Sequence, residues 1–144
     1  MDNQNHTILA FDYGEKRTGV ALGISITKTA RPLTTLYSVN SQPNWQEIDK
    51  LLTEWNPSRL IVGIPDDSEQ NKELRKNITL FCRELSDKSN LPVFTHDETL
   101  TSDEAYLQLK NKRKAVKSKI NKEDIDQIAA AILLESWMND NLPA

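Results

Sequence analysis

Three acidic residues occupy positions from which they could do chemistry together. Asp12 closes the apolar run 8–11, Glu98 directly follows a β-favouring segment at 92–96, and Asp126 lies early in a helical pattern that starts at Asn121. Because the carboxyl ends of parallel strands meet at one edge of a sheet, Asp12 and Glu98 are expected to lie close together. At helical spacing, Asp126 shares an inward face with the small and apolar residues Ala129, Ala130, Leu133 and Trp137.

Carboxylates gathered at one sheet edge repel one another and need compensating positive charge. Hard divalent cations with oxygen ligands, chiefly Mg²⁺ or Mn²⁺, are the natural source of that charge. Two such ions about 3.5–4 Å apart can activate water and stabilise the leaving oxygen of a phosphodiester. The pattern therefore predicts Asp12, Glu98 and Asp126 as metal ligands and catalytic residues. Singly they have plainer interpretations, as turn former, capping residue and helix-dipole partner respectively, and only their convergence favours a site.

Basic residues predict a partner with phosphates. Lys16 and Arg17 follow Asp12 in a turn bounded by glycines, and Arg31 lies a little beyond it. The segment 110–122, KNKRKAVKSKINK, contains seven basic residues and no acid. Alone it would be interpreted as a solvated loop or a frayed helix end, but beside the acids it is interpreted as a phosphate-binding arm. Its expected nucleic-acid contacts are Lys112, Arg113, Lys114 and Lys117.

The elements that must position these residues follow a simple order. Strand patterns come first, at 7–12, 18–24 and 32–37, and helices then alternate with strands. Helical patterns follow Asn44 and cover about 74–85, with strands at 59–65 and 92–96 and a capping box at 101–104 that opens a third helix. The final helix is expected to end near Met138. This order predicts an α/β fold with a mixed sheet, an antiparallel meander followed by crossover units.

Composition limits the class of protein. A chain of 144 residues, 38% hydrophobic and 27% charged, is expected to form a single domain over residues 1–144. No apolar run approaches the roughly 18 residues of a membrane span. The start MDNQNHT lacks a secretory pattern, and the single cysteine, Cys82, cannot form an internal disulfide. We therefore expect a cytoplasmic protein with no membrane partner.

Five segments, in order, resemble the YqgF/RuvX family of ribonuclease H-like nucleases. They are ILAFDYGEKRTGVALG, TARPL, LIVGIP, HDET and IDQIAAAILLESW. The resemblance spans nearly the whole chain and implies a five-stranded mixed sheet flanked by helices. It also implies metal-binding acids at Asp12, Glu98 and Asp126. The family was first regarded as Holliday-junction resolvases and is now also associated with maturing the 5′ end of pre-16S ribosomal RNA. The resemblance thus implies pre-rRNA as substrate, with branched DNA as the alternative.

Two departures from the family pattern leave other functions open. The loop after the fourth strand is Pro65-Asp66-Asp67-Ser68-Glu69, without the usual glycine, and Thr99 stands where the family has an arginine. A non-catalytic RNA-binding assembly factor is therefore one rival. Another is an actin-like ATPase or sugar kinase, which Asp12-Tyr13-Gly14 also resembles. Those enzymes enclose a nucleotide between two such domains, and this chain is long enough for one.

Overall fold

A mixed five-stranded sheet organises the part of the chain that the computed structural model describes, residues 6–98, 107 and 121–143. Its strands lie in the order β3-β2-β1-β4-β5. The meander consists of β1 (Thr7–Asp12), β2 (Arg17–Ile24) and β3 (Thr29–Tyr37), paired antiparallel. Both β4 (Arg59–Ile64) and β5 (Val93–Asp97) run parallel to β1. The predicted α/β architecture is confirmed.

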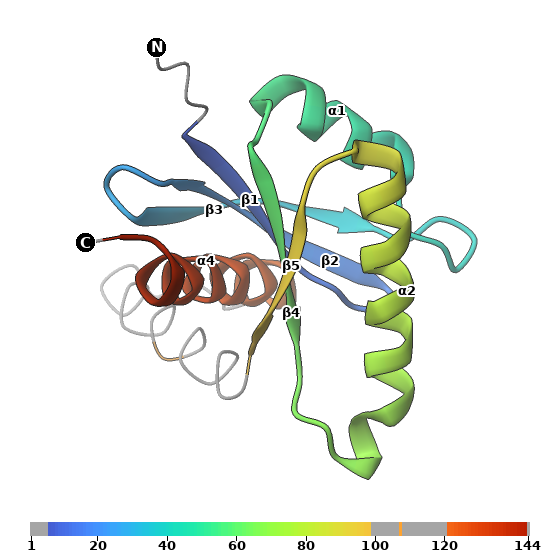
Figure 1. Ribbon diagram of the computed structural model, residues 1–144. Coiled ribbons are helices and arrows are strands. Elements are labelled where there is room, and N and C mark those ends of the chain that lie inside the picture. The colour runs from blue at the N-terminus through green and yellow to red at the C-terminus, as the bar shows by residue number, and fades with distance from the viewer. Residues whose placement is uncertain (1–5, 99–106, 108–120, 144) are drawn as a thin grey trace.

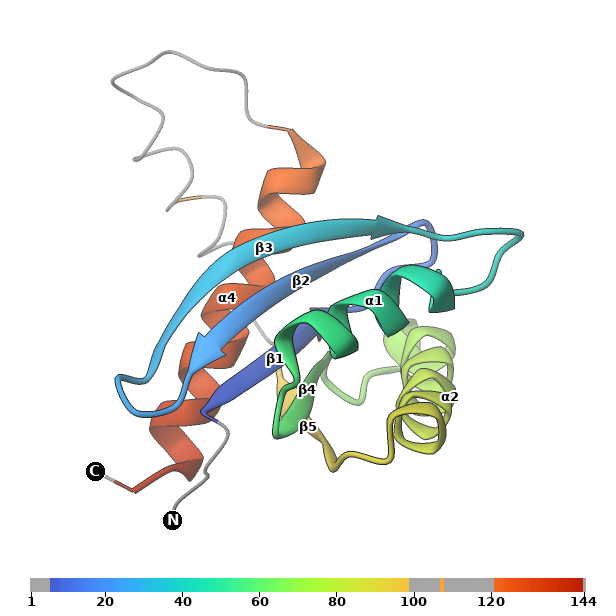
Figure 2. The ribbon, with the colours of Figure 1, turned by 90° about the horizontal axis from the view of Figure 1, so that it is seen from above.

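Helices cover both faces of this sheet (Figures 1 and 2). One face carries α1 (Trp45–Trp55) and α2 (Lys72–Ser89), the latter preceded by the short 3₁₀ helix Glu69–Asn71. The other carries α4 (Lys122–Asn141). Within the described residues, no helix is long and apolar enough to cross a membrane.

Alternation along β1 divides the core into two layers. Leu9 and Phe11 belong to the cluster shared with α1 and α2, whereas Ile8 and Ala10 belong to the cluster shared with α4. Successive strand residues point to opposite faces. The two residues that follow this pattern, Asp12 and Tyr13, therefore leave the end of β1 on opposite sides of the sheet.

The observed elements differ from the predicted ones mainly at their ends. The third strand begins at Thr29 rather than 32, because β3 is an edge strand and tolerates Pro32 opposite Ala21 beside a register shift. The fifth strand is displaced by one residue, to Val93–Asp97, and α4 continues to Asn141. The helix predicted to open at 101–104 and nearly all of the basic segment 110–122 lie outside the described residues.

Candidate active site

Two of the predicted acids meet at the carboxyl edge of the parallel strands. Asp12 ends β1, and Glu98 directly follows β5. The backbone N–H of Glu98 donates to the carbonyl of Ile64, the last residue of β4, at 3.1 Å. The end of β4, which lies between β1 and β5, thus fixes the backbone of Glu98 beside the end of β1.

A glycine makes room for the Glu98 side chain. A Cβ added at Gly63 would lie 2.6 Å from Oε2 of Glu98, closer than real Cβ atoms come to any neighbour. The carboxyl group therefore lies against the backbone of β4. The sequence predicts Gly63 only as part of an apolar strand, yet an isolated glycine inside such a run is itself a signal that something approaches the backbone closely.

The carboxyl groups of Asp12 and Glu98 hydrogen-bond to each other. Burial raises the pKa of Asp12 well above its ordinary value, and the nearby negative charges of Glu98 and Asp126 raise it further. Burial also raises the pKa of Glu98, which the bond to Asp12 partly offsets. Because two carboxyl oxygens can share such a bond only through a proton, the pair retains a proton more readily than isolated acids do.

Asp126 reaches the same edge from α4. A Cβ at Gly19, the residue paired with Asp12, would lie 2.2 Å from the backbone oxygen of Asp126, so the first turns of α4 lie directly on β2. The N-cap Asn121 accepts from the N–H of Asp124 at 2.9 Å and thus stabilises the start of the helix. The hydroxyl of Thr35 on β3 donates to the carbonyl of Glu123 at 3.2 Å.

Arg17 holds the Asp126 carboxylate. Its Nε donates to Oδ2 of Asp126 at 2.6 Å, and the two side chains are only 26% and 22% exposed. Burial raises the pKa of Asp126, while the hydrogen bond and charge of Arg17 lower it. Arg17 was expected to contact phosphates, whereas in this structure it neutralises one of the three acids. The residues are 109 positions apart in the chain, so no local pattern could have predicted the pair.

The donor set suits a hard divalent cation, although the acids do not form a complete metal cage. Among the described residues, no group of three or more His, Cys, Asp or Glu side chains is arranged to hold a metal ion. The reason is visible in the contacts, since Asp12 and Glu98 bond to each other and Asp126 is engaged by Arg17. The donors that the described residues bring to this edge are carboxylate oxygens, and a half-buried carboxyl pair that retains a proton is one that a cation could stabilise in the proton's place.

The remaining predicted contacts are distributed unevenly. Lys16 is exposed beside the site. Arg31 is not brought to it: Arg31 pairs with Leu22 along β3, and its guanidinium lies over the ring of Trp55 at 5.6 Å. The level of Arg31 is three positions along the strand from that of Asp12, because Leu22 pairs with Leu9. The other predicted contacts, Lys112, Arg113, Lys114 and Lys117, lie outside the described residues.

Fold and site together define the class of protein, a ribonuclease H-like α/β domain with acids at the carboxyl edge of β1. Two solved structures share the fold. One is RuvC from T. thermophilus in complex with a Holliday junction substrate, with a TM-score of 0.56, 14% identity and coverage of 94% of this chain and 95% of that one. The other is a Fowlpox virus resolvase with substrate Holliday junction DNA, with a TM-score of 0.53, 20% identity and coverage of 95% and 99%.

The chain belongs to the RuvX family, whose model, described as Holliday junction resolvase, matches residues 6–140. A relative from Haemophilus ducreyi is 44% identical over 140 residues, covering 94% of this chain and 97% of its own length. One from Pseudomonas putida is 40% identical over 135 residues, covering 93% and 95%. Both carry the name "Putative pre-16S rRNA nuclease".

Proposed function

We propose that this protein is a metal-dependent endonuclease that hydrolyses nucleic-acid phosphodiesters and matures the 5′ end of pre-16S ribosomal RNA. The observation that carries the proposal is the Asp12–Glu98 carboxyl pair at the end of β1, with Asp126 near enough to raise the pKa of Asp12. A pair of carboxyl groups whose pKa values are both raised is typical of a reactive site. The names of the relatives favour RNA as the substrate. A cytoplasmic location, expected from the sequence, is part of this proposal.

Asp12, Glu98 and Asp126 would hold Mg²⁺ or Mn²⁺. The bound cation supplies Lewis-acid polarisation of the phosphate and a lower pKa for water. The protein's own residues prepare this state in two ways. Asp12 and Glu98 would give up the proton of the bond between them to make way for a cation, and Asp126 would give up its bond to Arg17. Arg17, once released, would lie at the sheet edge where a substrate phosphate needs a donor.

Exposed cations would bring the substrate to this edge. Lys16 lies beside the acids, and the basic segment 110–122 carries charge for longer-range attraction. Phosphate contacts of this kind fix the position of a strand without selecting its sequence. Selection between RNA and DNA therefore depends on other contacts.

Resolution of branched DNA is the alternative activity, favoured by the description of the matching family model. A single assay separates the two. We expect cleavage of a pre-16S RNA fragment and none of a four-way DNA junction, in Mg²⁺ or Mn²⁺, with loss of cleavage in EDTA. Junction cleavage alone would overturn the RNA assignment and support the alternative.

Substitutions at the acids test the catalytic assignment itself. We expect Asp12→Asn, Glu98→Gln and Asp126→Asn each to lower the cleavage rate by at least about 100-fold, the scale of losing one electrostatic catalytic group. Asp49→Asn is the matched control, because Asp49 is exposed on α1 and away from the site. Cleavage at the parent rate by all three variants would overturn the assignment of these acids as catalytic, whereas RNA binding by the parent without any cleavage would show a non-catalytic assembly factor.

A further inference from the structure

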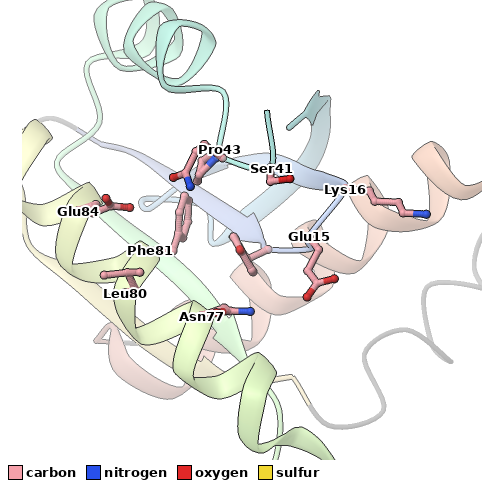
Figure 3. Close-up of a pocket in the computed structure, with 10 residues that line it drawn as sticks. Glu15, Lys16, Ser41, Pro43, Asn77, Leu80, Phe81 and Glu84 are labelled. Atoms are coloured by element: carbon pink, nitrogen blue, oxygen red, sulfur yellow. The ribbon is translucent and has the colours of Figure 1, made fainter. Parts of the chain in front are cut away.

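A cavity of about 420 Å³ lies beside the catalytic edge, on the face of the sheet that carries α1 and α2 (Figure 3). This volume is in the range of about 300–1,000 Å³ that small-molecule sites occupy. Three segments supply its walls: the turn after β1, the loop between β3 and α1, and the middle of α2. Nothing in the proposed hydrolysis uses it.

The cavity and the acids lie at the same edge of the sheet but on its opposite faces. Asp12 and Arg17 lie on the α4 side, where Arg17 bonds to Asp126. Tyr13, whose ring packs into the core cluster of α1 and α2, and Lys16 line the cavity on the other side. The Cα atoms of Asp12 and Tyr13 are one residue apart, about 3.8 Å. A strand of nucleic acid with one phosphate at Asp12 would have to cross the end of β1 to place a neighbouring base in the cavity.

Aromatic and apolar groups form one part of the lining. The partly buried ring of Tyr13 lies 5.1 Å from the ring of Phe81, which is itself buried and stacks with Trp45 at 5.6 Å, so the core holds the Tyr13 ring in place. Leu80 presents an apolar side chain that is 51% exposed. Tyr13 and Leu80 are the surfaces on which a flat ring can stack.

Polar groups of both kinds surround that floor. Asn77 and Gln42 each offer an amide with donors and an acceptor. Two carboxylates, Glu15 and Glu84, also line the cavity. Burial raises the pKa of Tyr13, and the negative charges of Glu15 and Glu84 raise that pKa further. The acids disfavour a phosphate inside the cavity but accept hydrogen bonds from ring and amino N–H groups. Lys16 extends outward from the rim, where it could meet a phosphate (Figure 3).

We propose that this cavity is a subsite for one unpaired nucleobase next to the scissile phosphate, so that the substrate strand bends over the end of β1. This inference rests on the proposed nuclease function and specifies its substrate as unpaired at that nucleotide. A base within a duplex cannot enter, because its edge and faces are already engaged by pairing and stacking.

The test uses a 12-nucleotide single-stranded RNA that carries 2-aminopurine, whose fluorescence falls when it stacks on an aromatic ring. Binding is measured in EDTA by anisotropy and by fluorescence intensity, with the same RNA in a full duplex for comparison. We expect quenching with the single strand and none with the duplex. Asn77→Trp, which fills the cavity, should abolish quenching and weaken binding roughly 5- to 100-fold, the value of one stacked base.

Asn139→Trp is the matched control, because Asn139 is exposed on α4, on the opposite face of the sheet; it should leave quenching and affinity unchanged. Circular dichroism establishes that both variants are folded. Binding of the single strand without quenching, or equal affinity for Asn77→Trp and parent, would overturn the subsite. Quenching without cleavage of pre-16S RNA in Mg²⁺ would leave the subsite standing and overturn the nuclease proposal alone.

Discussion

At the scale of single residues, the Asp12–Glu98 pair makes the site costly to fold without a cation. Two half-buried acids that are held together resist ionisation, and desolvation is the largest cause of this resistance. The free energy of unfolding is lowered at neutral pH, where both groups ionise freely in the unfolded chain. The carboxyl pair that the proposed function requires therefore lowers stability, and this loss can be measured.

The first prediction concerns the pH dependence of that cost. As pH falls through the raised pKa of Asp12, the folded protein binds a proton that the unfolded chain, titrating near 3.8, does not yet bind. In EDTA, the free energy of unfolding of the parent relative to Asp12→Asn should thus rise as pH is lowered from 7.5 towards 4.5. Urea titrations of both proteins measure it, with Asp49→Asn as control. A difference that is constant or falls would contradict the prediction.

A second residue-scale prediction follows from the bond between Arg17 and Asp126. A guanidinium beside the carboxylates competes with a divalent cation for the same charge, so Arg17→Gln should tighten Mn²⁺ binding roughly three- to thirtyfold. Calorimetric titration with MnCl₂ gives the affinity without any nucleic acid.

Lys50→Gln is the control for charge alone, since Lys50 is exposed on α1 and pairs with Glu47 there. Equal or weaker Mn²⁺ binding by Arg17→Gln would mean that Arg17 positions Asp126 for the cation instead of competing with it.

At the scale of elements, the sequence predicted the strands and helices that follow from residue patterns, but it did not predict the contacts that depend on packing. Apolar runs bounded by turn residues identified β1 and β4, and the parallel relation of β1 to β5 placed Asp12 near Glu98. The start of β3 was missed because this edge strand is partly exposed along its length and so lacks a clear alternation. Contacts between a strand and the helix that covers it, such as that between Gly19 of β2 and Asp126 of α4, leave no local signal in the sequence.

The packing of α4 on β2 gives an element-scale prediction. Gly19→Ala would drive a methyl group into the backbone of Asp126, which cannot yield without moving the start of α4. We expect a loss of about 1–3 kcal/mol in the free energy of unfolding and a large loss of cleavage, measured by urea titration and a pre-16S RNA assay.

Gly23→Ala on the same strand is the matched comparison. Its methyl group would meet the side-chain end of Leu134, farther along α4, which can rotate away. This variant should lose stability but retain cleavage. Equal effects on cleavage from both variants would indicate that Gly19 is not needed to keep Asp126 in position.

At the scale of the whole molecule, the distribution of charge matters more than the net charge of −3. The sheet edge that carries Asp12, Glu98 and Asp126 is acidic, and the loop after β4 adds Asp66 and Asp67. The side-chain amide of Asn71 donates to the Asp66 carboxylate at 2.7 Å, and Arg75 lies 3.7 Å from the Asp67 carboxylate. Arg17 and Arg75 offset part of this negative charge, but the remaining acids disfavour a polyanion. Besides Lys16 at the edge, the basic segment 110–122 is the densest source of attraction in the chain.

The last prediction tests that segment through the salt dependence of RNA binding. Each phosphate contact to a single strand contributes about −0.7 to the slope of log affinity against log salt, because counterions are released. Lys112→Gln with Lys114→Gln should therefore reduce the slope by about 1.4, and adding Arg113→Gln and Lys117→Gln should double the loss. Anisotropy titrations between 50 and about 300 mM KCl measure it.

Lys50→Gln with Lys88→Gln, on α1 and α2, removes the same charge as the first pair and should leave the slope unchanged. Equal reductions from the two pairs would mean that RNA responds to total charge, and the segment would then have no special part in binding.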